Sequence, residues 1–152
     1  MPLNSFSPNT KIQSAQVNSN FTNFSNHGRN ITLQWIFVGT LTTQTSTDWK
    51  SLPDDVTWDR ADIAVNTAPT GAAVIADIER STDNGGTWVT VFTNSANRPQ
   101  IAAGSRVGST TTVDVSAGTK NAHLFRAKIS QIGSTVAGAN LSVFLKGKYN
   151  LD

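Results

Sequence analysis

Ser and Asp are plentiful in the sequence, but residues that could assemble with them into a catalytic site are few. There are two histidines, His27 and His123, and no cysteine, which excludes disulfides, thiolate metal sites and thiol nucleophiles. His123 shares the parity of Phe125 and Ile129, which favours a packed or capping position at the start of a strand over a catalytic role. The motifs G-x-S-x-G and H-E-x-x-H and a glycine-rich phosphate loop are all absent. The sequence therefore predicts a protein that is not an enzyme and needs no cofactor.

One acidic cluster, formed by Asp54, Asp55, Asp59 and Asp62, could supply oxygen ligands to Ca²⁺. It lacks the D-x-D-x-D-G order of a known calcium loop. A solvated acidic turn is the favoured interpretation, and no metal site is predicted.

The stretch from Ser81 to Trp88 reads S-T-D-N-G-G-T-W and matches the Asp-box, S-x-D-x-G-x-T-W, at every specified position. This motif occurs in the blades of sialidase-like propellers, where it forms a structural turn. A single copy in 152 residues cannot build the several blades of a propeller. We therefore predict a structural hairpin turn that uses Ser81, Asp83, Gly85 and Trp88, and we do not predict glycan hydrolysis.

Two tryptophans, Trp49 and Trp58, stand in a polar segment that covers residues 42–59. A loop of this length is unusual in a compact domain and is often functional. Exposed indoles stack on the faces of sugar rings, so both tryptophans are candidate glycan contacts. The alternative is that they anchor the loop, because tryptophan is usually largely buried.

Alternating apolar residues predict the strands that would position these side chains. The pattern covers about eight strands separated by turn residues, within residues 31–41, 60–92, 98–103, 108–115, 125–130 and 141–146. Residues 60–92 are expected to form a β-meander whose last turn is Asp83 to Gly86. The prediction is an all-β protein with a single antiparallel β-sandwich of jelly-roll type. A small barrel is the alternative that the pattern does not separate from a sandwich.

Several strands carry apolar residues on the face that should meet solvent, namely Ile36, Val38, Leu124 and Phe144. A sandwich has one interior, so a second apolar face implies coverage by a neighbouring subunit or by the N-terminal segment. We therefore expect a symmetric homo-oligomer.

Residues 1–30 differ in composition from residues 31–152, the predicted sandwich domain, because they are rich in Asn and Ser. Val17, Phe21 and Phe24 have spacings of four and three, which could form the apolar stripe of a short helix. Such a helix is too short to be stable alone. The segment is expected to pack on its own subunit, to pack on a partner or to extend as an attachment arm. The candidate residues for attachment or for contact within an oligomer are Ile12, Val17, Phe21 and Phe24.

Composition sets limits on the partners. The net charge is +2 and charged residues make up 14% of the chain, which does not favour nucleic-acid or membrane binding. No apolar run approaches the ~18 residues of a spanning helix, and the N-terminus lacks a classical export signal. A soluble protein is predicted.

Three stretches resemble proteins of tailed bacteriophages. FSPNTKIQSAQVNSNFTNFSN, residues 6–26, resembles the N-terminal segment of virion proteins, and ADIAVNTAPTGAAVIADI (61–78) and KISQIGSTVAGANLSVFL (128–145) resemble a jelly-roll-like module of phage fibres, spikes and capsid-surface proteins. The resemblance implies a structural component of the virion, as a capsid decoration, head fibre, or tail fibre or spike protein. It also implies assembly in the host cytoplasm, attachment to other virion proteins through the N-terminal arm, and a homotrimer. The alternative is a carbohydrate-binding or host-receptor-binding module of a phage tail.

Overall fold

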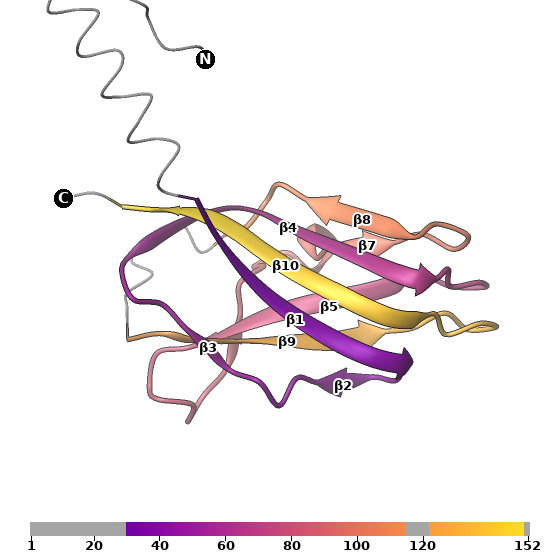
Figure 1. The fold of residues 1–152 in the computed structure, drawn as a ribbon, viewed down its shortest axis with the longest axis horizontal. Helices are drawn as coiled ribbons and strands as arrows, with labels where there is room; N and C mark the ends of the chain where they lie inside the picture. Colours follow the sequence, from indigo (N-terminus) through magenta and orange to yellow (C-terminus); the bar gives the residue numbers. More distant parts are fainter. Residues whose placement is uncertain (1–29, 115–121, 151–152) are drawn as a thin grey trace, which may run out of the picture. The chain divides into compact units, whose positions relative to one another are not determined.

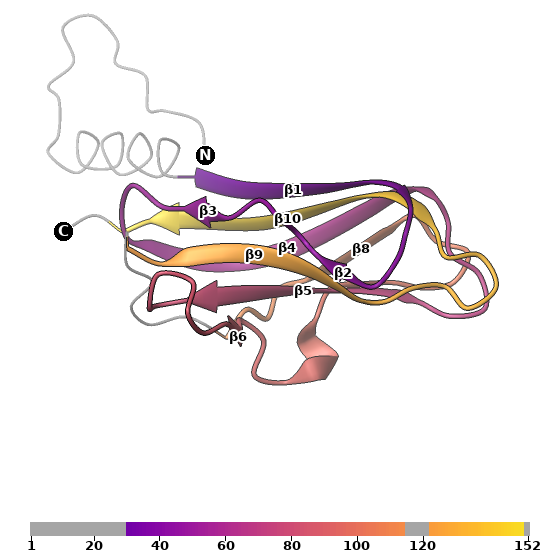
Figure 2. The same cartoon turned by 90° about the horizontal axis from the view of Figure 1, so that it is seen from below.

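The computed structural model describes residues 30–114 and 122–150. Two antiparallel sheets pack face to face, and Figures 1 and 2 show them from two directions. Sheet A contains, in spatial order, β1 (Asn30–Thr40), β10 (Ala139–Tyr149), β4 (Val56–Thr67) and β8 (Val107–Thr110). Sheet B is built on the pair β9 (Leu124–Gln131) and β5 (Val74–Ser81), with short strands on either side. These are β2 (Gln44–Thr45) and β3 (Lys50–Ser51) beside β9, and β6 (Val89–Thr90) and β7 (Gln100–Ile101) beside β5.

The strand order is that of a jelly roll. β2 and β3 share one position beside β9, and β6 and β7 share one position beside β5, so the ten strands of the described residues occupy eight positions. The chain passes repeatedly from one sheet to the other, and β1 pairs with the last strand, β10. The predicted all-β fold with a jelly-roll-like sandwich is confirmed. Among the described residues, no helix is long and apolar enough to cross a membrane.

The core lies between the two sheets and follows the period-2 alternation of the strands. Its inward-facing side chains include Leu33, Trp35 and Phe37 of β1, Leu141, Val143 and Leu145 of β10, Val74, Ala76 and Ile78 of β5, and Phe125, Ala127 and Ile129 of β9. Burying one Val, Leu, Ile or Phe side chain contributes about 1.5–3 kcal/mol to the free energy of folding. These side chains are therefore the main reason the two sheets associate.

A β-bulge in β4 changes which residues face the core. Trp58 pairs with Gly147 and Arg60 pairs with Lys146, so Asp59 is an extra residue in β4. Asp59 and Arg60 are both exposed, whereas Trp58 and Ala61 are both buried. Gly147 has no side chain to obstruct the indole, since a Cβ there would lie 2.8 Å from Cε3 of Trp58.

Two expectations about connections were wrong. The link from β4 to β5 crosses from sheet A to sheet B, so residues 60–92 do not form a continuous meander. Period-2 alternation is the same in a hairpin and in a crossover, which is why it could not separate them. The segment 42–59 is not one long loop, because it contains β2, β3 and the first residues of β4. The hairpin between β5 and β6 is present as predicted.

Candidate binding surfaces

The turn between β5 and β6 is closed by the side chains of the Asp-box. The carboxylate of Asp83 accepts hydrogen bonds from the backbone N–H of Thr87 (2.8 Å), from its hydroxyl (2.7 Å) and from the hydroxyl of Ser81 (2.7 Å). These bonds, with that from the Thr87 backbone the largest, lower the pKa of Asp83 to about 2. The Ser81 hydroxyl also accepts from the N–H of Gly85 at 2.8 Å. All of these contacts lie within the turn, as a structural role requires.

An exposed indole lies against this turn. Trp49, from the segment between β2 and β3, has 50% of its surface exposed. Its ring centroid lies 5.2 Å from that of Trp88, with an angle of 60° between the planes. Gly85 fits beneath Trp49, since a Cβ at Gly85 would lie 2.9 Å from Cζ3 of the indole. Trp88 is also held by the turn, because its Nε1 donates to the carbonyl oxygen of Gly85 at 3.1 Å.

Arg126 of β9 completes this surface. Its guanidinium carbon lies 4.2 Å from the ring centroid of Trp88, within cation–π range. Its Nε and Nη2 both lie 2.6 Å from Oε2 of Glu79, the buried residue opposite it in β5. We call Trp49, Trp88 and Arg126 together the aromatic platform. It lies on the outer face of sheet B.

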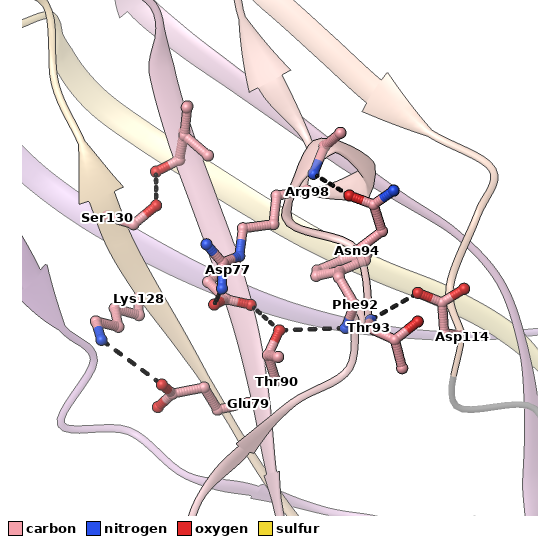
Figure 3. Close-up of polar contacts among 12 residues, drawn as sticks. Asp77, Glu79, Thr90, Phe92, Thr93, Asn94, Arg98, Asp114, Lys128 and Ser130 are labelled. Atoms are coloured by element: carbon pink, nitrogen blue, oxygen red, sulfur yellow. Dashed lines mark hydrogen bonds and ion pairs between the residues drawn. The ribbon is translucent and has the colours of Figure 1, made fainter.

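A second set of polar contacts holds β6 and the loop after it over β5, and Figure 3 shows these side chains. Asp77, with 4% of its surface exposed, accepts from the hydroxyl of Thr90 at 2.5 Å and forms an ion pair with Arg98 at 2.9 Å. Burial raises the pKa of Asp77, although the Thr90 hydroxyl and Arg98 act in the opposite direction. Farther along the loop, the N–H of Thr93 donates to Asp114 at 2.7 Å. The turn that supports the aromatic platform is therefore anchored at β6.

The outer face of sheet A carries apolar side chains on three of its strands. Ile36 and Val38 of β1 are 63% and 83% exposed, and Val107 of β8 is 71% exposed. Phe144 of β10 is half-buried on the same face, where its register partner is Asp62. We call Ile36, Val38, Val107 and Phe144 the apolar face.

Ion pairs lie among these apolar residues. Asp62 pairs with Lys146 at 2.8 Å and with Arg60 at 2.5 Å. Burial raises the pKa of Asp62, but the bonds from Lys146 and Arg60 outweigh it and hold the pKa below its usual value. Asp59 pairs with Lys148 at 3.4 Å. In residues 30–114 and 122–150, no three His, Cys, Asp or Glu side chains are grouped so that they could hold a metal ion.

The structure separates the two tryptophans that the sequence grouped. Trp49 is exposed, whereas Trp58 is 5% exposed and packs edge-on against Phe125 with centroids 5.4 Å apart. This corrects the expectation of a glycan contact at Trp58, because a core side chain cannot reach a ligand. The aromatic neighbour of Trp49 is Trp88 instead, which sequence reasoning had assigned only to the turn.

The other predicted contact residues fall into separate places. Ile36, Val38 and Phe144 share the outer face of sheet A, but Leu124 belongs to sheet B, where it is half-buried opposite Ser51 and Ser81. The exposure of Val107 was missed. The proposed N-terminal contacts, Ile12, Val17, Phe21 and Phe24, lie outside the described residues, as does the predicted arm or helix.

Glu79 and Arg126 were also missed. The sequence pattern that could have indicated them is a charged residue at alternate positions of two apolar strands, Asp77 and Glu79 in one and Arg126 and Lys128 in the other.

A comparison with known proteins found no matching protein-family model and no matching curated protein.

Proposed function

We propose that this chain is a structural subunit of a bacteriophage virion, as a capsid decoration, head fibre, or tail fibre or spike protein. In this proposal, residues 1–30 attach the subunit to other virion proteins, and the sandwich associates with further copies of itself, most simply as a trimer. The resemblance of residues 6–26, 61–78 and 128–145 to virion proteins supports the assignment to a virion. The observation that supports self-association of the sandwich is the exposed edge strand β1.

β1 has the properties of a strand that is covered in an assembly. It is 11 residues long, and among the described strands it pairs with β10 alone. No charged residue occurs from position 30 to position 47, although charges and prolines are the usual protection of a free edge. Ile36 and Val38 are exposed beside this edge, and the apolar face continues across sheet A to Val107. A second copy of the chain, which offers the same uncharged strand, is the partner that fits this surface.

Attachment to the particle can be tested with phage particles assembled without this protein. The full-length chain should bind them, and a variant that lacks residues 1–26 should not. The Trp49→Ala variant is the control and should bind as the full-length chain does, because Trp49 lies on the outer face of sheet B. Equal binding of the truncated and full-length chains would contradict attachment through the N-terminal segment.

The second candidate function is a carbohydrate-binding or host-receptor-binding module of a phage tail. The observation that favours it is the exposed position of Trp49 beside Trp88. Purified protein should then compete with the phage for adsorption to host cells. Unchanged adsorption at saturating protein concentration would contradict this function.

A further inference from the structure

We infer that the aromatic platform binds the pyranose ring of an uncharged glycan, which stacks on Trp49 and accepts hydrogen bonds from Arg126. The inference rests on the second proposed function and names the site and the ligand class for it.

The first reason is the position of Trp49. Tryptophan is usually largely buried, and it is enriched at surfaces that bind a partner. Gly85 and Trp88 contact Trp49 from within the protein, and half of its surface still reaches solvent. One side of a pyranose ring presents C–H groups, which pack well on the electron-rich face of an indole. A planar, supported indole is therefore suited to a sugar ring.

The second reason is the rigidity of the support. Trp88 is fixed by the carbonyl of Gly85 and by Arg126, and the turn beneath is closed by the bonds to Asp83. Because these contacts already fix the side chains of the platform, ligand binding costs little conformational entropy in the protein. A low entropic cost favours binding at a surface that makes few contacts. A loop without these bonds would have to become ordered when the sugar binds.

The third reason concerns charge and favours an uncharged ligand over an ionic one. Arg126 is paired with Glu79, and Lys50 is paired with Asp48. Lys128 lies 3.7 Å from the same carboxylate of Glu79. Two cations at the platform are thus each matched by a carboxylate, Arg126 by Glu79 and Lys50 by Asp48. A phosphate or carboxylate ligand would have to compete with these ion pairs for Arg126 and Lys50.

The hydrogen-bond donors that remain fit hydroxyl groups. Oε2 of Glu79 accepts from both Nε and Nη2 of Arg126, so this ion pair does not use the Nη1 group. The guanidinium carbon lies 4.2 Å from the ring centroid of Trp88, so the guanidinium group borders this indole. A neutral hydroxyl oxygen can accept from it without disturbing the ion pair.

The test is affinity electrophoresis of the full-length protein in gels that contain one soluble polysaccharide each. The uncharged set is a glucan, a mannan and a galactan, and polygalacturonate is the acidic comparison. We expect at least one uncharged polysaccharide to retard the protein, and the Trp49→Ala variant to bind it at least tenfold more weakly. Arg126→Lys should weaken binding severalfold, since lysine lacks the planar donor group. Val107→Ala, which alters an exposed apolar residue on the other sheet, is the matched control and should bind normally.

Four results would overturn the inference. Normal binding by Trp49→Ala would place the glycan elsewhere, and retardation only by polygalacturonate would show the wrong ligand class. If no uncharged polysaccharide retards the protein while it still competes for phage adsorption, the inference fails and the receptor-binding function stands. If it neither binds nor competes, both fail.

Discussion

The indole of Trp49 packs at 60° against that of Trp88, with 5.2 Å between the ring centroids. This contact brings the segment between β2 and β3 onto the Asp-box turn after β5. The Asp-box turn therefore closes the hairpin and also supports the surface side chain of Trp49. The pair also distinguishes Trp49 from Trp58, which lies in the core.

The two tryptophans of segment 42–59 should therefore contribute very differently to stability. Trp58→Ala should lower the free energy of unfolding by about 3–5 kcal/mol, because it leaves a cavity beside Phe125. Trp49→Ala should lower it by less than about 1.5 kcal/mol, since it removes one exposed aromatic contact. Urea unfolding followed by circular dichroism measures both values. Similar losses for the two variants would contradict the placement.

Gly85 should be required for the position of Trp49. It has a φ of +91°, and a Cβ there would lie 2.9 Å from the indole, so Gly85→Ala adds both backbone strain and a collision. We expect a loss of about 1–3 kcal/mol and a weaker near-ultraviolet circular dichroism signal from the Trp49–Trp88 pair. Gly104→Ala is the matched control, because Gly104 has a φ of +82° and nothing within 4 Å of a Cβ. If both variants keep the signal, Gly85 does not position the indole.

The Asp-box should show its own pH dependence. The folded-state pKa of Asp83 is about 2, below the ordinary 3.8, because Thr87 and Ser81 donate to its carboxylate. The stabilisation from this group should be complete above pH 3.8 and should be lost as the pH falls through about 2. NMR titration of the Asp83 carboxyl carbon measures the pKa, and Thr87→Val should raise it by removing one donor. A midpoint near the ordinary value in the native protein would contradict the hydrogen bonding described.

The ion pair beneath β6 should matter more than the exposed pairs on sheet A. Asp77→Ala should cost about 2–3 kcal/mol, because it leaves Arg98 and Thr90 without their buried partner. Asp62→Ala is the comparison and should cost about 1 kcal/mol or less, since Arg60 and Lys146 are nearly half exposed. Chemical denaturation of both variants gives the two values. An equal cost for the two variants would argue against the anchoring role of Asp77.

Period-2 alternation was sufficient to predict most of the fold. The strands around Trp35, Ile129 and Val143 alternate strictly, so their inward faces could be assigned without a structure. Trp58 could not be assigned in this way, because the bulge at Asp59 reverses the alternation within β4. The residues of the aromatic platform were difficult for another reason. Trp49, Trp88 and Arg126 come from three distant segments, and no local spacing indicates that they meet.

Light scattering of the purified full-length chain tests the central proposal, self-association through β1 and the apolar face, most directly. The wild-type protein should have three times the mass of the 16.2 kDa chain at micromolar concentration. The double variant Ile36→Lys, Val38→Lys should be a monomer, because charges on the edge strand oppose pairing. Trp49→Ala, on the other sheet, should keep the wild-type mass. A monomeric wild-type protein, or a double variant with unchanged mass, would contradict the proposal.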